Sequence, residues 1–435
     1  MGVEKFQKKV EHITYLLLVQ LTRYYYFSYD LFLLISPKEK ELELESISPY
    51  QPNRVDMLYK SPRRLLLRLV LWFLLLSLFS FLLVLGLKLN FPTPATTVLT
   101  SSTTTEQSFE KLCATLNDSR LVSEIKDLRI LVAANFKDVE HLLPVFSHQI
   151  SRLKEYLKAE NIFVSIYESG SCDRSQTLLK ELEAKLNPEK IQNRILFGNR
   201  TRKKGENRIK FLSSIRNQVL SVLDEKIFVP DYVLFSNDVF FCTEHLIRLL
   251  YRSMKGADMV CALDFNEEYQ FYDTWVARDS RGMPLRQSRD CSVFTSDADS
   301  RLCREGLAVP VHSCWNGLVA LRSSVFTMQG IRFRYVENEE EECAGSECTL
   351  LCNDMWRNGF RSIYVDPGVR VAYQARIFRD LEIEKPVLNE EVFSVIKEQE
   401  LVPFDPPDKF FCCPLPPQSA RDDPNLNVAY FASVL

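Results

Sequence analysis

The sequence predicts an α/β domain with a mostly parallel sheet flanked by helices, behind a single N-terminal transmembrane helix. From residue 128 onward, short apolar runs alternate with amphipathic helical stretches, a pattern typical of α/β proteins. An uncharged apolar stretch covers residues 69–87. All 12 cysteines follow this stretch, and the first is Cys113. Together these observations indicate an anchored protein whose globular domain lies in an oxidising compartment.

The stretch 69–87 contains 19 residues and no charge. A helix needs about 20 apolar residues to cross the hydrocarbon core of a bilayer. Three arginines, the last of them Arg68, precede the stretch, whereas Lys88 alone follows it closely. The positive-inside rule therefore places residues 1–68 in the cytosol and the rest of the chain in the lumen. The apolar run starts too late and is too long for a cleaved signal peptide.

An earlier apolar stretch covers residues 15–35, but Gln20, Arg23 and Asp30 interrupt it. This pattern favours a helix that lies in the membrane interface. A second span is the alternative. The segment that follows is basic enough to stay cytosolic, so the C-terminal domain would be lumenal in either case.

Residues 88–120 are expected to form a stem, because their Ser/Thr/Pro-rich part, 91–109, cannot bury a core. Two glycosylation sequons follow, at Asn117 and Asn199. The cysteines of the lumenal part predict disulfides, with buried free thiols as the alternative, and the pairing cannot be read from the sequence. The expected layout is a cytosolic region (1–68), an anchor (69–87), a stem (88–120), a main folded domain (121–380) and a Pro-rich extension packed on that domain (381–435).

The elements of the domain follow from the apolar pattern. Buried strands are predicted at 128–134, 162–167, 232–235 and 258–265, and helices at 139–157, from 175, and at 209–222. The chain has no Gly-x-Gly-x-x-Gly sequence, which disfavours a dinucleotide-binding domain. Its net charge of -3 gives no electrostatic reason to expect nucleic acid as a partner.

Polar residues follow two of the predicted strands. Residues 168–173 follow the second strand, and Asn237 and Asp238 follow the strand 232–235. Ligands of α/β folds bind at the carboxyl ends of the strands. A carboxylate there suits Mg²⁺ or Mn²⁺, which prefer oxygen ligands beside phosphates. The alternative for Asp238 alone is a turn or a helix cap.

Tryptophans and carboxylates gather in short polar segments further along the chain, at 272–279, 313–317, 346–348 and 353–356. Aromatic faces stack on the C–H surfaces of sugars, and carboxylates bind hydroxyls or exchange protons. These segments therefore suggest a sugar site. For each tryptophan taken singly, ordinary core packing is the alternative.

At these segments the chain resembles the fungal cryptococcal-type α-1,3-mannosyltransferases, the capsule-associated mannosyltransferase family. The resemblance covers roughly residues 128–373 and rests on the order of several motifs. These are ILVAAN (130–135), NIFVSIYESGSCD (161–173), the Arg-Asn pair at the end of 208–217, FSNDVFF (235–241), GADMVCALDF (256–265), YDTWVARD (272–279), SCWNG (313–317), SECTLL (346–351) and VRVAY (369–373).

The resemblance implies a type II Golgi membrane protein with a lumenal GT-A-like glycosyltransferase domain. It implies GDP-mannose as donor, a mannose-containing glycan as acceptor, and α-1,3 transfer that depends on Mn²⁺ or Mg²⁺. Because donor and product are both α-linked, it also implies retention of the anomeric configuration.

The resemblance also assigns site residues. Asn237 and Asp238 stand at the position of a DxD-type metal motif, with Asp238 as the metal ligand and Asp264 as a second carboxylate. Here the motif reads Ser-Asn-Asp, so its first carboxylate is missing. Glu168, Asp173 and Arg216 are expected to bind the nucleotide. Glu347 is the first candidate for the catalytic carboxylate, and Asp354 is the second. Trp315 and Asn316 are expected to line the sugar pocket.

Two other functions stay open at this point. The incomplete metal motif favours an inactive lumenal sugar-binding or scaffold protein of the same fold, whereas the retained Asp238, Arg216 and Glu347 argue against it. A related transferase with another donor, such as UDP-xylose, is the second alternative.

Overall fold

The computed structural model describes residues 109, 112–113, 119–338, 342–384, 396, 398–413 and 430–434. The expected cytosolic region and transmembrane helix, and most of the expected stem, lie outside these residues. Within the described part, no helix is both long enough and apolar enough to cross a bilayer.

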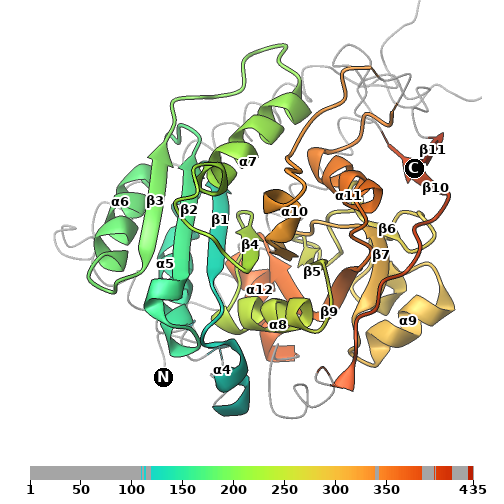
Figure 1. The fold of residues 1–435 in the computed structure, drawn as a ribbon, viewed down its shortest axis with the longest axis horizontal. Helices are drawn as coiled ribbons and strands as arrows, with labels where there is room; N and C mark the ends of the chain where they lie inside the picture. Colours follow the sequence, from blue (N-terminus) through green and yellow to red (C-terminus); the bar gives the residue numbers. More distant parts are fainter. Residues whose placement is uncertain are drawn as a thin grey trace, which may run out of the picture. The chain divides into compact units, whose positions relative to one another are not determined.

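A nine-stranded sheet forms the centre of the domain, in the order β3-β2-β1-β4-β8-β5-β9-β7-β6 (Figure 1). Its strands are β1 (Ile130–Phe136), β2 (Ile162–Glu168), β3 (Gln192–Phe197), β4 (Tyr232–Ser236), β5 (Met259–Phe265), β6 (Arg278–Asp279), β7 (Val309–Ser313), β8 (Leu318–Arg322) and β9 (Ile363–Ala372). A separate antiparallel pair consists of β10 (Lys409–Cys412) and β11 (Tyr430–Ser433).

The helices are α4 (Ser119–Ile125), α5 (Leu143–Arg152), α6 (Ser175–Leu186), α7 (Arg208–Asp224), α8 (Thr243–Met254), α9 (Asp297–Arg304), α10 (Ser324–Thr327), α11 (Glu347–Arg357) and α12 (Ala375–Glu384). Helix α7 packs on β1 and β2, and α8 packs on β4, β5, β8 and β9. Strands β1, β2 and β5 are buried along almost their whole length, as expected for strands covered on both faces.

The prediction of a mostly parallel sheet is correct only in part. The pairs among β3, β2, β1 and β4 are parallel, as is the pair β5–β9. The other four neighbouring pairs are antiparallel. Each of these involves β6, β7 or β8, which come from residues 278–322, where the sequence shows no regular alternation of strands and helices. The fold is therefore a mixed α/β fold.

The order of the first four strands creates a switch point. The chain places β2 and β3 on one side of β1 and then returns to place β4 on the other side. The carboxyl ends of β1 and β4 consequently lie side by side, with Ala134 opposite Ser236. In open α/β sheets such a reversal leaves a crevice that binds ligands.

Four disulfides stabilise the domain, so the disulfide prediction is confirmed for eight of the 12 cysteines. They join Cys113 to Cys242, Cys261 to Cys314, Cys291 to Cys303, and Cys343 to Cys412. Cys172, Cys348, Cys352 and Cys413 remain free thiols. The first bridge ties the end of the expected stem to the start of α8, and Phe109 stacks on Phe240 beside it. The fourth bridge ties β10 to the domain.

Candidate active site

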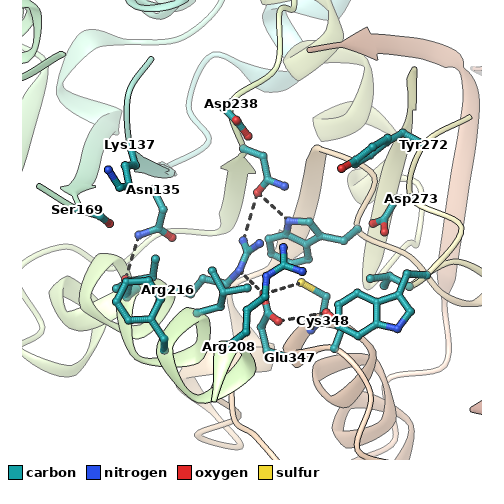
Figure 2. A pocket seen from close by; sticks show the side chains of 18 of the residues that line it. Asn135, Lys137, Ser169, Arg208, Arg216, Asp238, Tyr272, Asp273, Glu347 and Cys348 are labelled. Carbon is teal, nitrogen blue, oxygen red and sulfur yellow. Dashed lines mark hydrogen bonds and ion pairs between the residues drawn. The ribbon is translucent and has the colours of Figure 1, made fainter. Parts of the chain in front are cut away.

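A cavity of about 840 Å³ opens at the carboxyl ends of β1, β2, β4 and β9 (Figure 2). It therefore includes the crevice expected at the β1–β4 switch point. Helix α7, the loop after β5 and the start of α11 complete its wall. The lining residues are Asn135, Phe136, Lys137, Ser169, Arg208, Phe211, Leu212, Ile215, Arg216, Asn237, Asp238, Tyr272, Asp273, Trp275, Val276, Trp315, Ser346, Glu347, Cys348, Tyr373 and Cys413.

Asn237 is fixed where β4 ends. Its backbone N–H donates to the carbonyl of Gly317 at 2.8 Å. Its side-chain oxygen accepts hydrogen bonds from the indole Nε1 of Trp315 at 3.0 Å and from Nη1 of Arg216 at 3.3 Å. Asp238 follows directly and exposes its carboxylate in the cavity. The Asn237 amide thus orients Trp315 and Arg216, while the Asp238 carboxylate stays accessible to a ligand.

A tight turn brings Trp315 into this position. Asn316 and Gly317 both have positive φ angles, of 53° and 77°. A Cβ atom on Gly317 would approach Val239 Cγ1 to 2.9 Å, so the turn has no room for a side chain there. The side chain of Asn316 points away from the cavity and donates to the carbonyl of Ala262 at 2.8 Å. Asn316 therefore supports the turn, and Trp315 lines the cavity.

Arg216 and Glu347 form a buried ion pair in the wall. Nε of Arg216 donates to Oε1 of Glu347 at 3.0 Å, and both side chains are at most a tenth exposed. The guanidinium lies 4.7 Å from the ring centre of Trp315 and slightly farther from those of Phe235 and Phe333. Such contacts stabilise a cation out of water. Arg216 therefore holds Glu347 in a single orientation at the cavity surface.

The first turn of α11 supports the same carboxylate. Ser346 precedes the helix, and its hydroxyl accepts a hydrogen bond from the backbone N–H of Cys348. A serine at this position satisfies one of the free N–H groups of a helix start. The same hydroxyl donates to Oε2 of Glu347 at 3.1 Å. The Ser-Glu sequence thus starts the helix and directs its first carboxylate into the cavity.

A second carboxylate cluster lies beside the cavity. Tyr373 donates through its hydroxyl to Oδ2 of Asp264 at 2.9 Å, and the backbone N–H of Asp273 donates to Oδ1 at 3.2 Å. Burial, together with the Asp273 carboxylate, raises the pKa of Asp264 to about 8. Burial also raises the pKa of Asp273 to about 6. The cluster therefore holds a proton near neutral pH.

The oxygen ligands at the cavity suit a divalent cation that is bound partly by the protein and partly by a substrate. Asp238 offers one accessible carboxylate, and among the described residues no group of three or more His, Cys, Asp or Glu side chains is arranged to hold a metal. Mg²⁺ is commonly bound through one or two carboxylates together with substrate phosphates. The arrangement fits that mode and does not fit a metal centre built from protein ligands alone.

Residues 129–354 match the family model described as Cryptococcal mannosyltransferase 1, over slightly more than half of the chain. The chain belongs to this family. The resemblance seen in the motifs is therefore confirmed. The chain is also 31% identical over 280 residues to the α-1,3-mannosyltransferase CMT1 of Cryptococcus neoformans var. neoformans serotype D. That alignment covers 58% of this chain and 59% of the relative, so it spans about three-fifths of the relative's length.

Two solved structures show weaker similarity. The mannosyltransferase PcManGT from Pyrobaculum calidifontis, in complex with GDP-Man and Mn²⁺, is 10% identical, with a TM-score of 0.35 over 62% of this chain and 65% of that one. GalNAc-T7 with UDP, GalNAc and Mn²⁺ is 14% identical, with a TM-score of 0.36 over 56% of this chain and 43% of that one.

The structure brings five of the predicted site residues together at the cavity. These are Asn237, Asp238, Arg216, Trp315 and Glu347. They come from four separated motifs of the family, and hydrogen bonds or ion pairs link all but Asp238 into one network.

The other predicted residues lie outside the cavity lining. Glu168 is buried beneath the turn after β2, where it accepts hydrogen bonds from Ser171 and Gln176, while its neighbour Ser169 lines the cavity. Asp173 accepts hydrogen bonds from the backbone N–H groups of Ser175 and Glu140. These two carboxylates therefore stabilise the turn.

Asp354, Asp264 and Asn316 also lie outside the lining. Asp354 forms ion pairs with Arg334 at 2.7 Å and Arg357 at 3.4 Å. Its carboxylate is thus paired with two arginines, and Asp354 lies two helical turns from Glu347 along α11. Asp264 lies behind Asp273 and Tyr373, in contact with both.

Several lining residues were not predicted as site residues. Asp273 lies in the YDTWVARD motif but follows no strand directly, so the rule of strand ends does not reveal it. Tyr373 does follow the end of β9, but the sequence analysis predicted no strand there, so the rule was not applied to it. Lys137 follows β1 in the same way, and Arg208 begins α7.

Proposed function

We propose that this protein transfers mannose from GDP-mannose to a mannose-containing acceptor in α-1,3 linkage, in a metal-dependent reaction that retains the anomeric configuration. Membership of the mannosyltransferase family supports the reaction class. The observation that carries the proposal is the convergence of Asp238, Arg216 and Glu347, from three motifs distant in sequence, on one cavity at the β1–β4 switch point. The enzyme would be of the GT-A-like type.

In this proposal the lining residues have separate roles in binding the donor. Lys137, Arg208 and Arg216 are the lining cations, and they would contact the diphosphate. Lys137 is also paired with Asp138, and Arg216 with Glu347. Asp238 would hold the divalent cation. When bound, that ion would neutralise charge on the departing GDP.

The transfer itself exchanges two bonds. The bond between mannose C1 and the diphosphate oxygen breaks, and its electron pair leaves with GDP. A bond between C1 and the acceptor 3-hydroxyl oxygen forms, and the proton of that hydroxyl passes to the phosphate oxygen that departs with GDP. Glu347 is the cavity carboxylate held by two partners, Arg216 and Ser346, and it is suited to stabilise positive charge that develops at the sugar.

We further propose a Golgi location, with residues 69–87 as a signal anchor and the described domain in the lumen. The four disulfides support an oxidising compartment. Asn199 of the second sequon is exposed, as a glycosylated asparagine must be. Endoglycosidase treatment of the protein from intact cells should increase its mobility on a gel, and Asn199→Gln should reduce this effect. A protein with no glycan would contradict the lumenal location.

The function is tested with the purified full-length protein and Mn²⁺. Separate reactions contain GDP-mannose, UDP-glucose, UDP-galactose or UDP-xylose, with mannose or α-mannobiose as acceptor, and free nucleotide and product linkage are measured. GDP release from GDP-mannose alone, lost on chelation, with an α-1,3-linked product, is the expected result. Release from UDP-xylose alone would favour the other donor. No release by folded protein would favour a sugar-binding protein without turnover.

A further inference from the structure

The cavity has two chemically different sides. Its cations, Lys137, Arg208 and Arg216, come from the end of β1 and from α7. The aromatic residues Tyr272, Trp275 and Tyr373 come from the loop after β5 and from the end of β9, whereas the lining residues Phe136 and Phe211 lie on the same elements as the cations. In Figure 2, Lys137 lies on one side of the cavity and Tyr272 and Asp273 on the other, with Asp238 and Glu347 between them. A polyanionic donor matches the first side, and a neutral sugar matches the second.

Tyr272 is unusually exposed for an aromatic residue in a cavity wall. It is 55% exposed, among the largest values for the apolar and aromatic side chains of the described domain. Its position is nevertheless fixed. Its backbone N–H donates to the carbonyl of Asp264 at 3.0 Å, and its ring packs edge-on against that of Tyr373, with ring centres 4.9 Å apart. An edge contact of this kind leaves a face of the Tyr272 ring available for a ligand.

The neighbouring groups are held as firmly. The indole Nε1 of Trp275 donates to the carbonyl of Cys413 at 2.7 Å. Oδ2 of Asp273 accepts a hydrogen bond from the backbone N–H of Asn316 at 3.2 Å. Asp273 also lines the cavity, directly after Tyr272 in the chain. A rigid aromatic face beside an oriented carboxylate is the combination that binds a pyranose, because the ring covers its C–H surface and the carboxylate accepts from a hydroxyl.

We propose that Tyr272 and Asp273 form the acceptor subsite, in which an apolar face of the acceptor mannose lies on the Tyr272 ring while a hydroxyl of the same sugar donates to the Asp273 carboxylate. This inference rests on the proposed function for the identity of the sugar. It places the donor phosphates on the side of Lys137 and the acceptor on the opposite side, so that the two reactants meet between Asp238 and Glu347.

The test measures binding without turnover. The full-length protein is saturated with GDP and Mn²⁺, and α-mannobiose is titrated in by calorimetry. Tyr272→Ala should raise the Kd roughly five- to tenfold, because the stacking surface is lost. Tyr272→Phe keeps the ring and should stay within about twofold of the wild-type protein. Phe431→Ala is the matched control, since Phe431 is 52% exposed and lies outside the cavity lining, and its Kd should not change.

Kinetics supply an independent measurement. For Tyr272→Ala the KM for α-mannobiose should rise by the same factor, whereas the KM for GDP-mannose should rise less than twofold. Asp273→Asn should also raise the Kd for α-mannobiose. An unchanged Kd in Tyr272→Ala, no binding by the wild-type protein, or equal increases in both KM values would overturn the subsite. If the wild-type protein binds α-mannobiose through Tyr272 but releases no GDP, the transferase function fails while the subsite stands.

Discussion

Replacing Glu347 by Leu should destabilise the fold, because it leaves the Arg216 guanidinium buried without its carboxylate partner. Arg216 is 8% exposed and Glu347 is 2% exposed. Removal of one partner of a buried ion pair costs about 3–5 kcal/mol. Here the Asn237 oxygen and three aromatic rings still contact the guanidinium. We therefore expect the low end of that range, about 3 kcal/mol.

The assay is thermal unfolding by calorimetry at one pH, in buffer without nucleotide or metal. With an unfolding entropy of about 2.1 cal/mol/K per residue, a loss of about 3 kcal/mol lowers the Tm of a domain of this size by about 4 °C. The double variant Arg216→Met/Glu347→Leu should recover most of the loss, since apolar side chains of similar volume commonly replace a buried pair without cost.

The matched control is Glu225→Leu, which removes a partner of Arg194 from an ion pair at the surface. Its atoms lie 2.7 Å apart, closer than those of the buried pair, but Glu225 is half exposed. Its loss should lower the Tm much less than the loss of Glu347 does, because exposed ion pairs contribute little to stability. A Glu347→Leu protein as stable as the wild-type protein, or a double variant no more stable than the single one, would refute this account of the cavity wall.

Three further predictions concern stability. Asn237→Leu should lower the free energy of unfolding by about 1–3 kcal/mol, because the Trp315 indole N–H loses its acceptor. Asn237→Asp keeps an acceptor oxygen and should lower it less, and chemical denaturation measures both values. The free energy of unfolding should fall as the pH rises from about 4 to about 8, because native Asp264 keeps a proton that the same residue in the unfolded chain, with a pKa of 3.8, has released. Asp264→Asn should flatten this pH profile. A variant with the same profile as the wild-type protein would contradict the raised pKa of Asp264. Cys113→Ser should cost about 2–5 kcal/mol by opening the bridge to Cys242, and a Tm equal to that of the wild-type protein would contradict its role.

The sequence predicted four strands of the sheet well, because each of them is a continuous apolar run. β1, β2, β4 and β5 all begin within two residues of their predicted starts. Strands β3, β6, β7, β8 and β9 were not predicted. β3 is partly polar and only partly buried, and the apolar run of β9 is interrupted by Asp366, Pro367 and Gly368. Strands β6, β7 and β8 are short, and no regular helix pattern separates them. Their antiparallel pairing depends on contacts between distant segments, which local periodicity does not encode.

The site was predicted best where one local rule applies. Asp238 follows a buried parallel strand, and that position alone brings it to the cavity. Asp354, which the family resemblance assigned to the site, lies outside the cavity lining. It lies seven residues after Glu347 on α11, on the same face but about 10 Å farther along the helix axis, where two arginines neutralise it. Asp273 was missed as a site residue because it lies in the loop after β5 and follows no strand directly.

The central claim is that sugar transfer occurs in the cavity at the β1–β4 switch point. The most direct test compares GDP release from GDP-mannose, with Mn²⁺ and α-mannobiose, by the wild-type protein, Asp238→Asn and Asp405→Asn. Asp405 is the control because its side chain is 90% exposed and lies outside the cavity lining. The account predicts a loss of about 100-fold or more for Asp238→Asn with an unchanged Tm, and wild-type release for Asp405→Asn. Equal release by all three folded proteins would contradict it.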